Sequence, residues 1–183
     1  MTPRVFEPSS RPVMLIALGL CCIGCDRAVA PISDADGKKM EESIQPATAA
    51  DRARIAEHEA RVLKMLQARY GEVQLLQTEA DLALLQRLSD DGALKPGMSA
   101  ELESVGIVFG QVLAGRSRLR WITVEWEGER TLALQYPKTT VIIFPGSMIA
   151  KRVARGERVD FAALRQAVLS QVNEMKSDPE YKR

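Results

Sequence analysis

Hydrophobic positions along the chain follow two periods, which separate helices from strands. Apolar residues spaced three and four apart predict helices at 51–70, 78–89 and 100–113. Alternating or continuous apolar runs predict strands at 121–127, 131–136 and 140–144. A short helix ending at Arg155 and a last helix after Asp160 complete the pattern. The order predicts an α+β fold: an N-terminal helical hairpin, a helix, a three-stranded antiparallel meander, a short helix and a C-terminal helix packed on one sheet face.

Residues at the ends of these segments refine the prediction. Asp51 and Ser99 are expected to cap their helices, and Thr78 with Asp81 has the spacing of a capping box. Gly106 and Gly110 lie four apart on the third helix, which permits close backbone approach to a neighbour. We expect that neighbour to be the sheet.

The register of the first two strands follows from burial. With a three-residue loop at 128–130, Trp126 faces Leu132 and Val124 faces Leu134, so that large side chains share one face. A shift by one residue would turn every side chain to the other face. The three-residue loop is therefore the expected connection.

The N-terminal pattern differs from the rest and predicts export. Arg4 and Arg11 precede an apolar run at 13–23, which is too short to span a membrane and has the layout of a secretory signal. The run ends in Ile-Gly-Cys, which resembles the bacterial lipobox and predicts a lipid on Cys25. Cys22 stands where the lipobox usually has leucine. The alternatives are a cut after Ala30 and an uncleaved anchor or buried N-terminal helix.

These patterns divide the chain into four parts. Residues 1–24 are the expected lipoprotein signal peptide, 25–49 a flexible tether, 50–92 the helical hairpin and 98–176 the α+β domain. Removing the signal takes away two of the 25 basic and one of the 24 acidic residues, which leaves 23 of each. A neutral chain argues against a nucleic-acid partner, because such binders carry a basic field.

The sequence offers few groups for catalysis. The single histidine, His58, lies between two glutamates in a helix, where a solvated residue is expected. Zinc sites of the usual His/Cys type cannot be assembled, and no serine lies in a Gly-x-Ser-x-Gly turn. Glu125 and Glu127 alternate on a strand face that we expect to be solvated. We therefore predict no metal and no cofactor, and no catalytic residue is assigned.

Four basic residues are the candidates for a binding site. Lys151 and Arg152 lie on the short helix, where Met148 and Ile149 can supply the buried contacts and leave both cations exposed. Arg116 and Arg118 precede the first predicted strand. These side chains suit an anionic ligand or partner.

The C-terminal half resembles a known family. The pieces that carry the resemblance are Tyr-Pro at 136, Phe-Pro at 144, Met-Ile-x-Lys-Arg from 148 and Gly-Glu-x-Val-Asp from 156. Together with the preceding helix and strand they look like the bacterial domain of unknown function 3806 family, over about Ser99 to Val172. The family carries no established activity, so the resemblance supplies no site residues.

The sequence-based hypothesis is a membrane-tethered, non-catalytic binding or scaffold lipoprotein of the bacterial envelope. It would face the periplasm or the cell exterior, with the membrane reached through Cys25 and an envelope protein or anionic ligand as partner. One alternative is an envelope enzyme that acts on glycans with carboxylates and arginines. Another is a chaperone-like binder that uses the hairpin at 51–90.

Overall fold

The computed structural model describes residues 43–115, 117–126 and 128–182. The expected signal peptide, Cys25, most of the expected tether, Arg116 and Glu127 lie outside the described residues. Within them the chain forms helices and an antiparallel sheet, so the predicted α+β class is confirmed.

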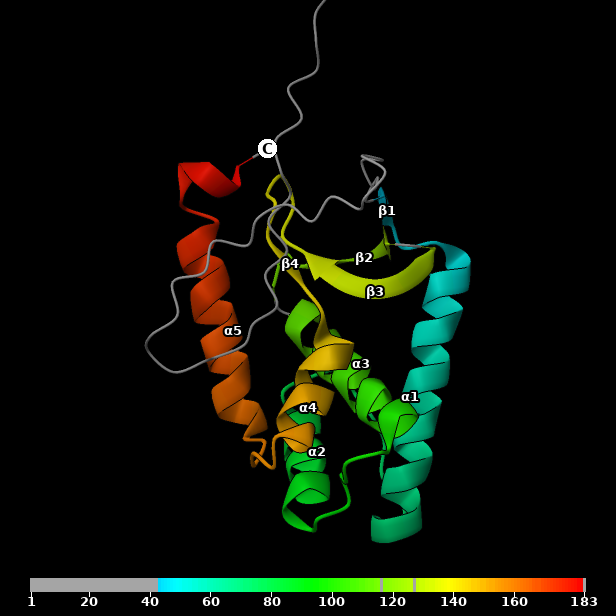
Figure 1. Cartoon of the computed structure of the whole chain (residues 1–183). Coiled ribbons are helices and arrows are strands. Elements are labelled where there is room, and N and C mark those ends of the chain that lie inside the picture. The colour runs from blue at the N-terminus through cyan, green and yellow to red at the C-terminus, as the bar shows by residue number, and fades with distance from the viewer. Residues whose placement is uncertain (1–42, 116, 127, 183) are drawn as a thin grey trace, which may run out of the picture.

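The sheet has four strands in the order β1-β2-β3-β4, all antiparallel. They are β1 (Ser43–Pro46), β2 (Arg120–Trp126), β3 (Glu129–Gln135) and β4 (Ile142–Ile143). The helices are α1 (Ala49–Tyr70), α2 (Ala80–Asp90), α3 (Ser99–Gly115), α4 (Pro145–Ala154) and α5 (Phe161–Met175), followed by the short 3-10 helix η1 (Pro179–Tyr181). Figure 1 shows the sheet at one end of the molecule, with the helices extending from it.

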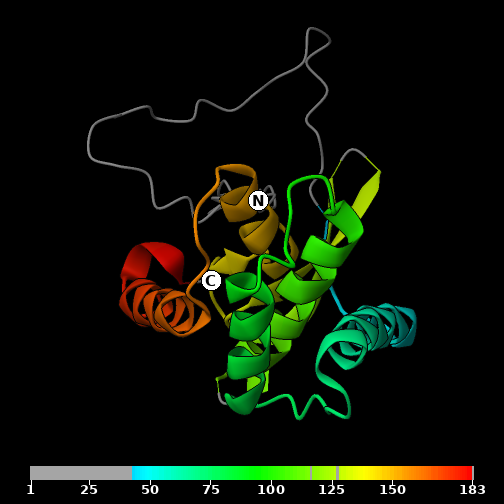
Figure 2. The ribbon, with the colours of Figure 1, turned by 90° about the horizontal axis from the view of Figure 1, so that it is seen from below.

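Helix α3 is the centre of the molecule. In Figure 2 it lies with α2 between α1 on one side and α5 on the other. Ten of its residues are buried, among them Leu102, Val105, Val108, Phe109 and Val112. The ring of Phe109 meets that of Phe161 edge-on, with 5.9 Å between the centroids. The main hydrophobic core therefore surrounds α3 and joins it to α5.

Two glycines allow α3 to approach its neighbours closely. A Cβ atom at Gly106 would lie 2.3 Å from the carbonyl oxygen of Pro145, at the start of α4. A Cβ at Gly110 would lie 2.8 Å from the ring of Trp121, on β2. The expected close approach is present, but at Gly106 the neighbour is a helix and only at Gly110 is it the sheet.

Helices α1 and α2 do not form the expected antiparallel hairpin. Near the start of α2, the Gln77 side-chain amide donates to Glu59 Oε1 (3.0 Å), about three turns before the end of α1. At the other end of α2, the Tyr70 hydroxyl donates to Asp91 Oδ2 (2.6 Å). The connection at 71–79 thus returns along α1, and the two helices run in the same direction. Helix α1 packs mainly on α3, and α2 on α5 and α3.

The helix caps also differ in detail from the prediction. The N-cap of α1 is Thr48, and Asp51 is the third helical residue of a capping box. The Asp81 carboxylate does not close a box with Thr78. It accepts hydrogen bonds from the backbone N–H groups of Leu76 and Gln77, which fixes the end of the connection from α1.

The register of β2 and β3 is not the predicted one. Trp126 pairs with Glu129 across a two-residue connection, and Trp121 pairs with Leu134. Buried apolar residues lie on both faces of these strands: Leu132 and Leu134 belong to the helix side, whereas Ile122, Val124, Ala133 and Ile142 form a second cluster. Because both faces bury apolar side chains, burial did not select a unique register.

Strand β1 lies inside the expected tether. It pairs antiparallel with β2, with Ile44 opposite Val124 and Pro46 opposite Ile122. Pro46 has no N–H to donate, which an edge strand tolerates. Residues 43–49, which were predicted to belong to the tether, are therefore part of the fold or connect two of its elements.

Replacing Gly106 by alanine tests the contact between α3 and α4. In an ordinary helix this change gains up to about 1 kcal/mol, but here the new methyl group would overlap backbone atoms of Pro145 and Gly146. We expect Gly106→Ala to lower the free energy of unfolding by about 3 kcal/mol or more, measured by denaturant titration. Glu101→Ala on the same helix is the control and should cost less than about 0.5 kcal/mol. A Gly106→Ala protein as stable as the control would contradict the contact.

Candidate functional site

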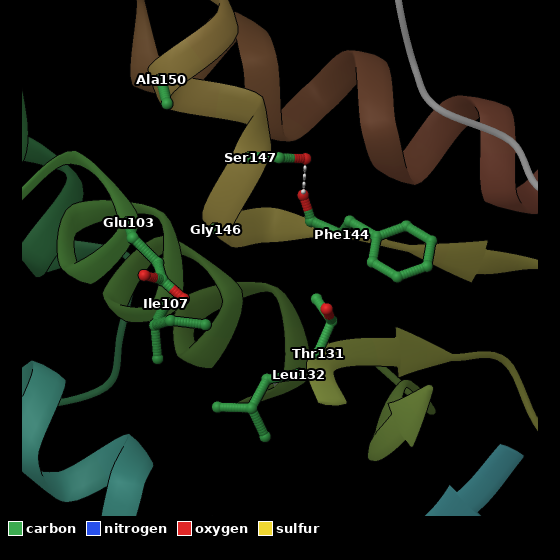
Figure 3. A pocket seen from close by; sticks show the side chains of 8 residues that line it. All are labelled: Glu103, Ile107, Thr131, Leu132, Phe144, Gly146, Ser147 and Ala150. Atoms are coloured by element: carbon green, nitrogen blue, oxygen red, sulfur yellow. Dashed lines mark hydrogen bonds between the residues drawn. The ribbon is translucent and has the colours of Figure 1, made fainter. Parts of the chain in front are cut away.

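A pocket of about 210 Å³ lies where α3, β3 and the first turns of α4 meet. Its walls come from three separate parts of the chain: Glu103 and Ile107 from α3, Thr131 and Leu132 from β3, and Phe144, Gly146, Ser147 and Ala150 at and after the start of α4 (Figure 3). The volume is below the roughly 300–1,000 Å³ of pockets for drug-sized ligands. The pocket suits a single side chain or a small group.

The start of α4 explains why the pocket is open. Pro145 and Gly146 are the first residues of α4, and the N-cap residue Phe144 makes no side-chain capping bond. A Cβ at Gly146 would lie 3.2 Å from Cγ of Glu103, so the glutamate side chain lies against the first turn of α4. A larger residue at 146 would press on Glu103 and narrow the space.

Polar side chains around the pocket are few, and the first-turn N–H groups of α4, which has no side-chain cap, lie beside them. The Glu103 side chain is exposed, and no ion pair or hydrogen bond joins it to another described residue. The Ser147 hydroxyl donates to the Phe144 carbonyl (3.3 Å), which leaves its lone pairs available (Figure 3). The Thr131 hydroxyl is the third side-chain polar group among the residues that line the pocket. Sequence reasoning missed this site because its residues are distant in the chain; the Pro-Gly at the start of α4 was the available signal.

The structure describes three of the four basic residues that were predicted as candidates for a binding site. Lys151 is exposed, as expected, and so is Arg118. Arg152 was expected to be exposed but is buried, with 8% of its surface accessible. Its guanidinium donates to the Met148 carbonyl (3.0 Å), and burial lowers its pKa while the charge of Glu157 opposes this. The Arg152 side chain is therefore held against its own helix, and Arg116 lies outside the described residues.

His58 is not the solvated residue that the sequence suggested. It is half-buried, and its Nδ1 lies 2.9 Å from the Ser104 hydroxyl on α3. Ser104 is fully buried and donates its proton to the Ala100 carbonyl (2.6 Å), while Arg61 also donates to it. His58 Nδ1 must then be the donor, since a hydroxyl has one proton. A catalytic serine must instead donate its proton to the histidine. The contact between His58 and Ser104 therefore has a structural role and joins α1 to α3.

A second polar chain joins α1, α3 and β2. The Trp121 indole N–H donates to Gln111 Oε1 (2.7 Å), and the Gln111 amide donates to Glu59 Oε1 (2.9 Å). Glu59 also accepts from Gln77. Every group in this chain serves the packing of neighbouring elements.

Asp51 ties the start of α1 to the sheet. It is 2% exposed, and its Oδ2 accepts from the Thr48 backbone N–H (2.8 Å), the Thr48 hydroxyl (2.7 Å) and Arg130 (2.8 Å). Burial would raise the pKa of Asp51, but these partners, with the nearby Thr123 hydroxyl, together lower it to about 2. The Thr123 hydroxyl makes no hydrogen bond of normal length. Asp51 is therefore ionised and fully engaged.

The described residues offer neither a cluster of metal ligands nor a membrane-spanning helix. No group of three or more His, Cys, Asp or Glu side chains in 43–115, 117–126 and 128–182 is placed to hold a metal ion. No helix in the described part of the chain has the length and apolar character needed to cross a membrane. Glu125 is exposed, but Thr123 on the same face of β2 is buried, so this strand face is only partly solvated.

Comparison with known families decides the classification of the central part of the chain. Residues 81–164 match the family described as "Domain of unknown function (DUF3806)". This stretch belongs to the DUF3806 family. The DUF3806 match begins in α2 and ends at Leu164 in α5, so α2, which the sequence placed outside the family, lies inside it. All of the residues that line the pocket fall within the DUF3806 domain.

A solved structure shares the fold. A crystal structure from Bacteroides thetaiotaomicron VPI-5482, at 1.50 Å resolution, superposes with a TM-score of 0.66 and 19% sequence identity. The superposition covers 76% of this chain and 52% of that one, so this chain spans about half the length of its structural relative. At this identity the likeness concerns the fold alone. No curated protein matches the chain.

The buried environment of His58 predicts a pH effect on stability. Desolvation lowers the pKa of His58; the charge of Glu103 opposes this, and Arg61 and Arg54 add to it. The unfolded state therefore binds more protons than the native state between the native pKa and about 6.5, and stability falls as the pH falls through that range. We expect the unfolding free energy to decrease from pH 7 to pH 5.

The variant His58→Asn isolates this effect. Its amide can still donate to Ser104 but does not titrate, so its stability should change less over the same pH range. Asp51 does not interfere, because its contribution is lost only as the pH falls below about 4 towards 2. Denaturant titrations at intervals from pH 7 to pH 5 measure both proteins, and parallel curves for the two would contradict the prediction.

Proposed function

We propose that this protein is a non-catalytic binding lipoprotein of the bacterial envelope, tethered to a membrane through a lipid on Cys25, and that it binds its partner through the pocket in its DUF3806 domain. The observation that carries the binding role is the pocket itself. It is lined by apolar side chains from three elements and keeps one carboxylate without a partner among the described residues. Such a concave apolar site with few polar groups is typical of binding pockets.

The other polar side chains described above are already hydrogen-bonded within the fold, which supports the pocket as the binding site. Asp51, His58, Ser104, Glu59 and Gln111 all make hydrogen bonds that hold helices to each other or to the sheet. These groups are committed to the fold, whereas Glu103 is not. The side chain best placed to meet a ligand is therefore an acid, which shifts the proposed partner from the anionic ligand expected from the sequence to a cationic group.

The location rests on the sequence. The basic start, the short apolar run and the Ile-Gly-Cys ending support export and lipidation at Cys25. Seventeen residues separate Cys25 from Ser43, the first residue of β1. A coil of that length reaches roughly 20–25 Å, so the domain would stay near the bilayer surface and meet partners within the envelope.

Replacing Cys25 by serine tests the anchor. A serine cannot accept the thioether-linked lipid, so we expect Cys25→Ser to incorporate no label from a palmitate analogue supplied to growing cells. The precursor should remain uncut at this site or be cut near Ala30. Cys22→Ser is the matched control and should still be labelled. Label that persists on the Cys25→Ser protein would contradict lipidation at this cysteine.

Filling the pocket tests the binding site. Ala150 lines the pocket on α4, and Ala150→Leu should occupy part of the space with little effect on the melting temperature, because leucine is a good helix former. We expect crosslinking recovery of partners from native membranes to fall about tenfold, as for a loss of about 1.4 kcal/mol in binding. Ala154→Leu, exposed near the end of the same helix, is the control. Equal recovery with both variants would mean that the pocket is not the binding site.

A further inference from the structure

We infer that the pocket binds a primary ammonium group carried on an apolar stem, the chemistry of a lysine side chain presented by a protein partner. This inference rests on the proposed binding role of the same pocket and adds the identity of the group that enters it.

The walls of the pocket match the stem. Ile107, Leu132 and Ala150 present aliphatic side chains, and Phe144 adds a ring. Figure 3 shows these residues around a common space, with Glu103 from α3 on one side and Phe144 on the other. A lysine side chain buries its methylene groups against apolar surface and keeps its charge at the tip. The volume of about 210 Å³ favours one such side chain over a larger ligand.

The polar groups match the ammonium tip. An ammonium group has three N–H donors and no acceptor. Three of the residues that line this mainly apolar pocket carry a side-chain oxygen at its rim: Glu103, Ser147 and Thr131. The Ser147 proton is already donated to Phe144, so this hydroxyl can meet a ligand as an acceptor. A carboxylate ligand could accept from the first-turn N–H groups of α4 but would meet the negative charge of Glu103.

The charge balance favours a cation despite the nearby helix end. The N-terminus of α4 carries a partial positive charge equivalent to about half a unit, and the side chain of Glu103 lies against it. This arrangement stabilises the ionised carboxylate, but a full negative charge exceeds the partial positive one. His58 senses the charge of Glu103, and burial favours its neutral form; Arg61 and Arg54 also act on His58 from α1. Among the residues that line the pocket, the charged one is Glu103.

Three probes of one size and different charge test the inference. n-Butylammonium reproduces the lysine side chain from Cβ outward, n-butanol is its neutral analogue, and n-butyrate is an anion. Each is titrated into the full-length chain, labelled with ¹³C in its methyl groups and held in a non-ionic detergent. The methyl signals of Ile107, Leu132 and Ala150 report on the pocket. We expect saturable shifts with n-butylammonium, with a dissociation constant on the order of 1–10 mM.

Two variants identify the carboxylate. Glu103→Gln keeps the shape and removes the charge, and it should weaken n-butylammonium binding on the order of tenfold. Glu101→Gln removes the same charge from the same helix outside the pocket and should leave binding unchanged. Shifts as large with n-butanol or n-butyrate, or binding unaffected by Glu103→Gln, would overturn the ammonium assignment.

The two experiments together distinguish a wrong ligand assignment from a wrong binding site. If Ala150→Leu abolishes partner recovery but n-butylammonium does not bind, the pocket is the site and its ligand is not an ammonium group. If Ala150→Leu leaves partner recovery unchanged, the pocket is not the partner site, and the inference about a partner's lysine fails with it, whatever the small probes do.

Discussion

The contact between the backbone of α3 at Gly106 and the first turn of α4 determines much of the arrangement. With 2.3 Å between a notional Cβ and the Pro145 oxygen, α4 cannot sit at this distance over any other residue type. The close contact brings Glu103 and Ile107, on either side of Gly106, against Gly146. It also places β4, which directly precedes α4, beside β3. The pocket is therefore a by-product of a backbone contact, and its shape is fixed by the same atoms that hold the helices together.

Around this centre the domain joins its elements with buried polar groups as well as apolar packing. Ser104 and Gln111 on α3 each bind a side chain of α1, and Asp51 binds α1 to β3. Gln86 on α2 makes a similar link, because its amide binds the backbone of Val159, just before α5, and of Phe161, the first residue of α5. Buried groups of this kind are costly when unpaired, so each bond specifies one relative position of two elements. These bonds contribute mainly by selecting one arrangement of the elements, and less by adding stability.

The helices could be predicted from the sequence, because a period of 3.6 in apolar positions persists over several turns. The β2–β3 register could not, since apolar residues on both faces satisfied more than one alignment. Strand β1 was missed because four residues that include Gln45 and Pro46 carry no strand pattern and are defined only by their partner on β2. Arg152 was predictable in principle: it lies three and four residues after Ile149 and Met148, on their buried face. The pocket could not be predicted, because its walls meet only when α3, β3 and α4 are placed in space.

Strand β1 has a mechanical consequence for a protein held by its N-terminal segment. If the protein is tethered as proposed, tension from the anchor reaches the described residues at Ser43 and acts first on the hydrogen bonds between β1 and β2. A pull along β1 loads these bonds in shear, so that they share the force and do not open one after another. Behind them, Asp51 fastens the start of α1 to Arg130 on β3. The four residues of β1 would therefore be the first of the described elements to detach under such a pull.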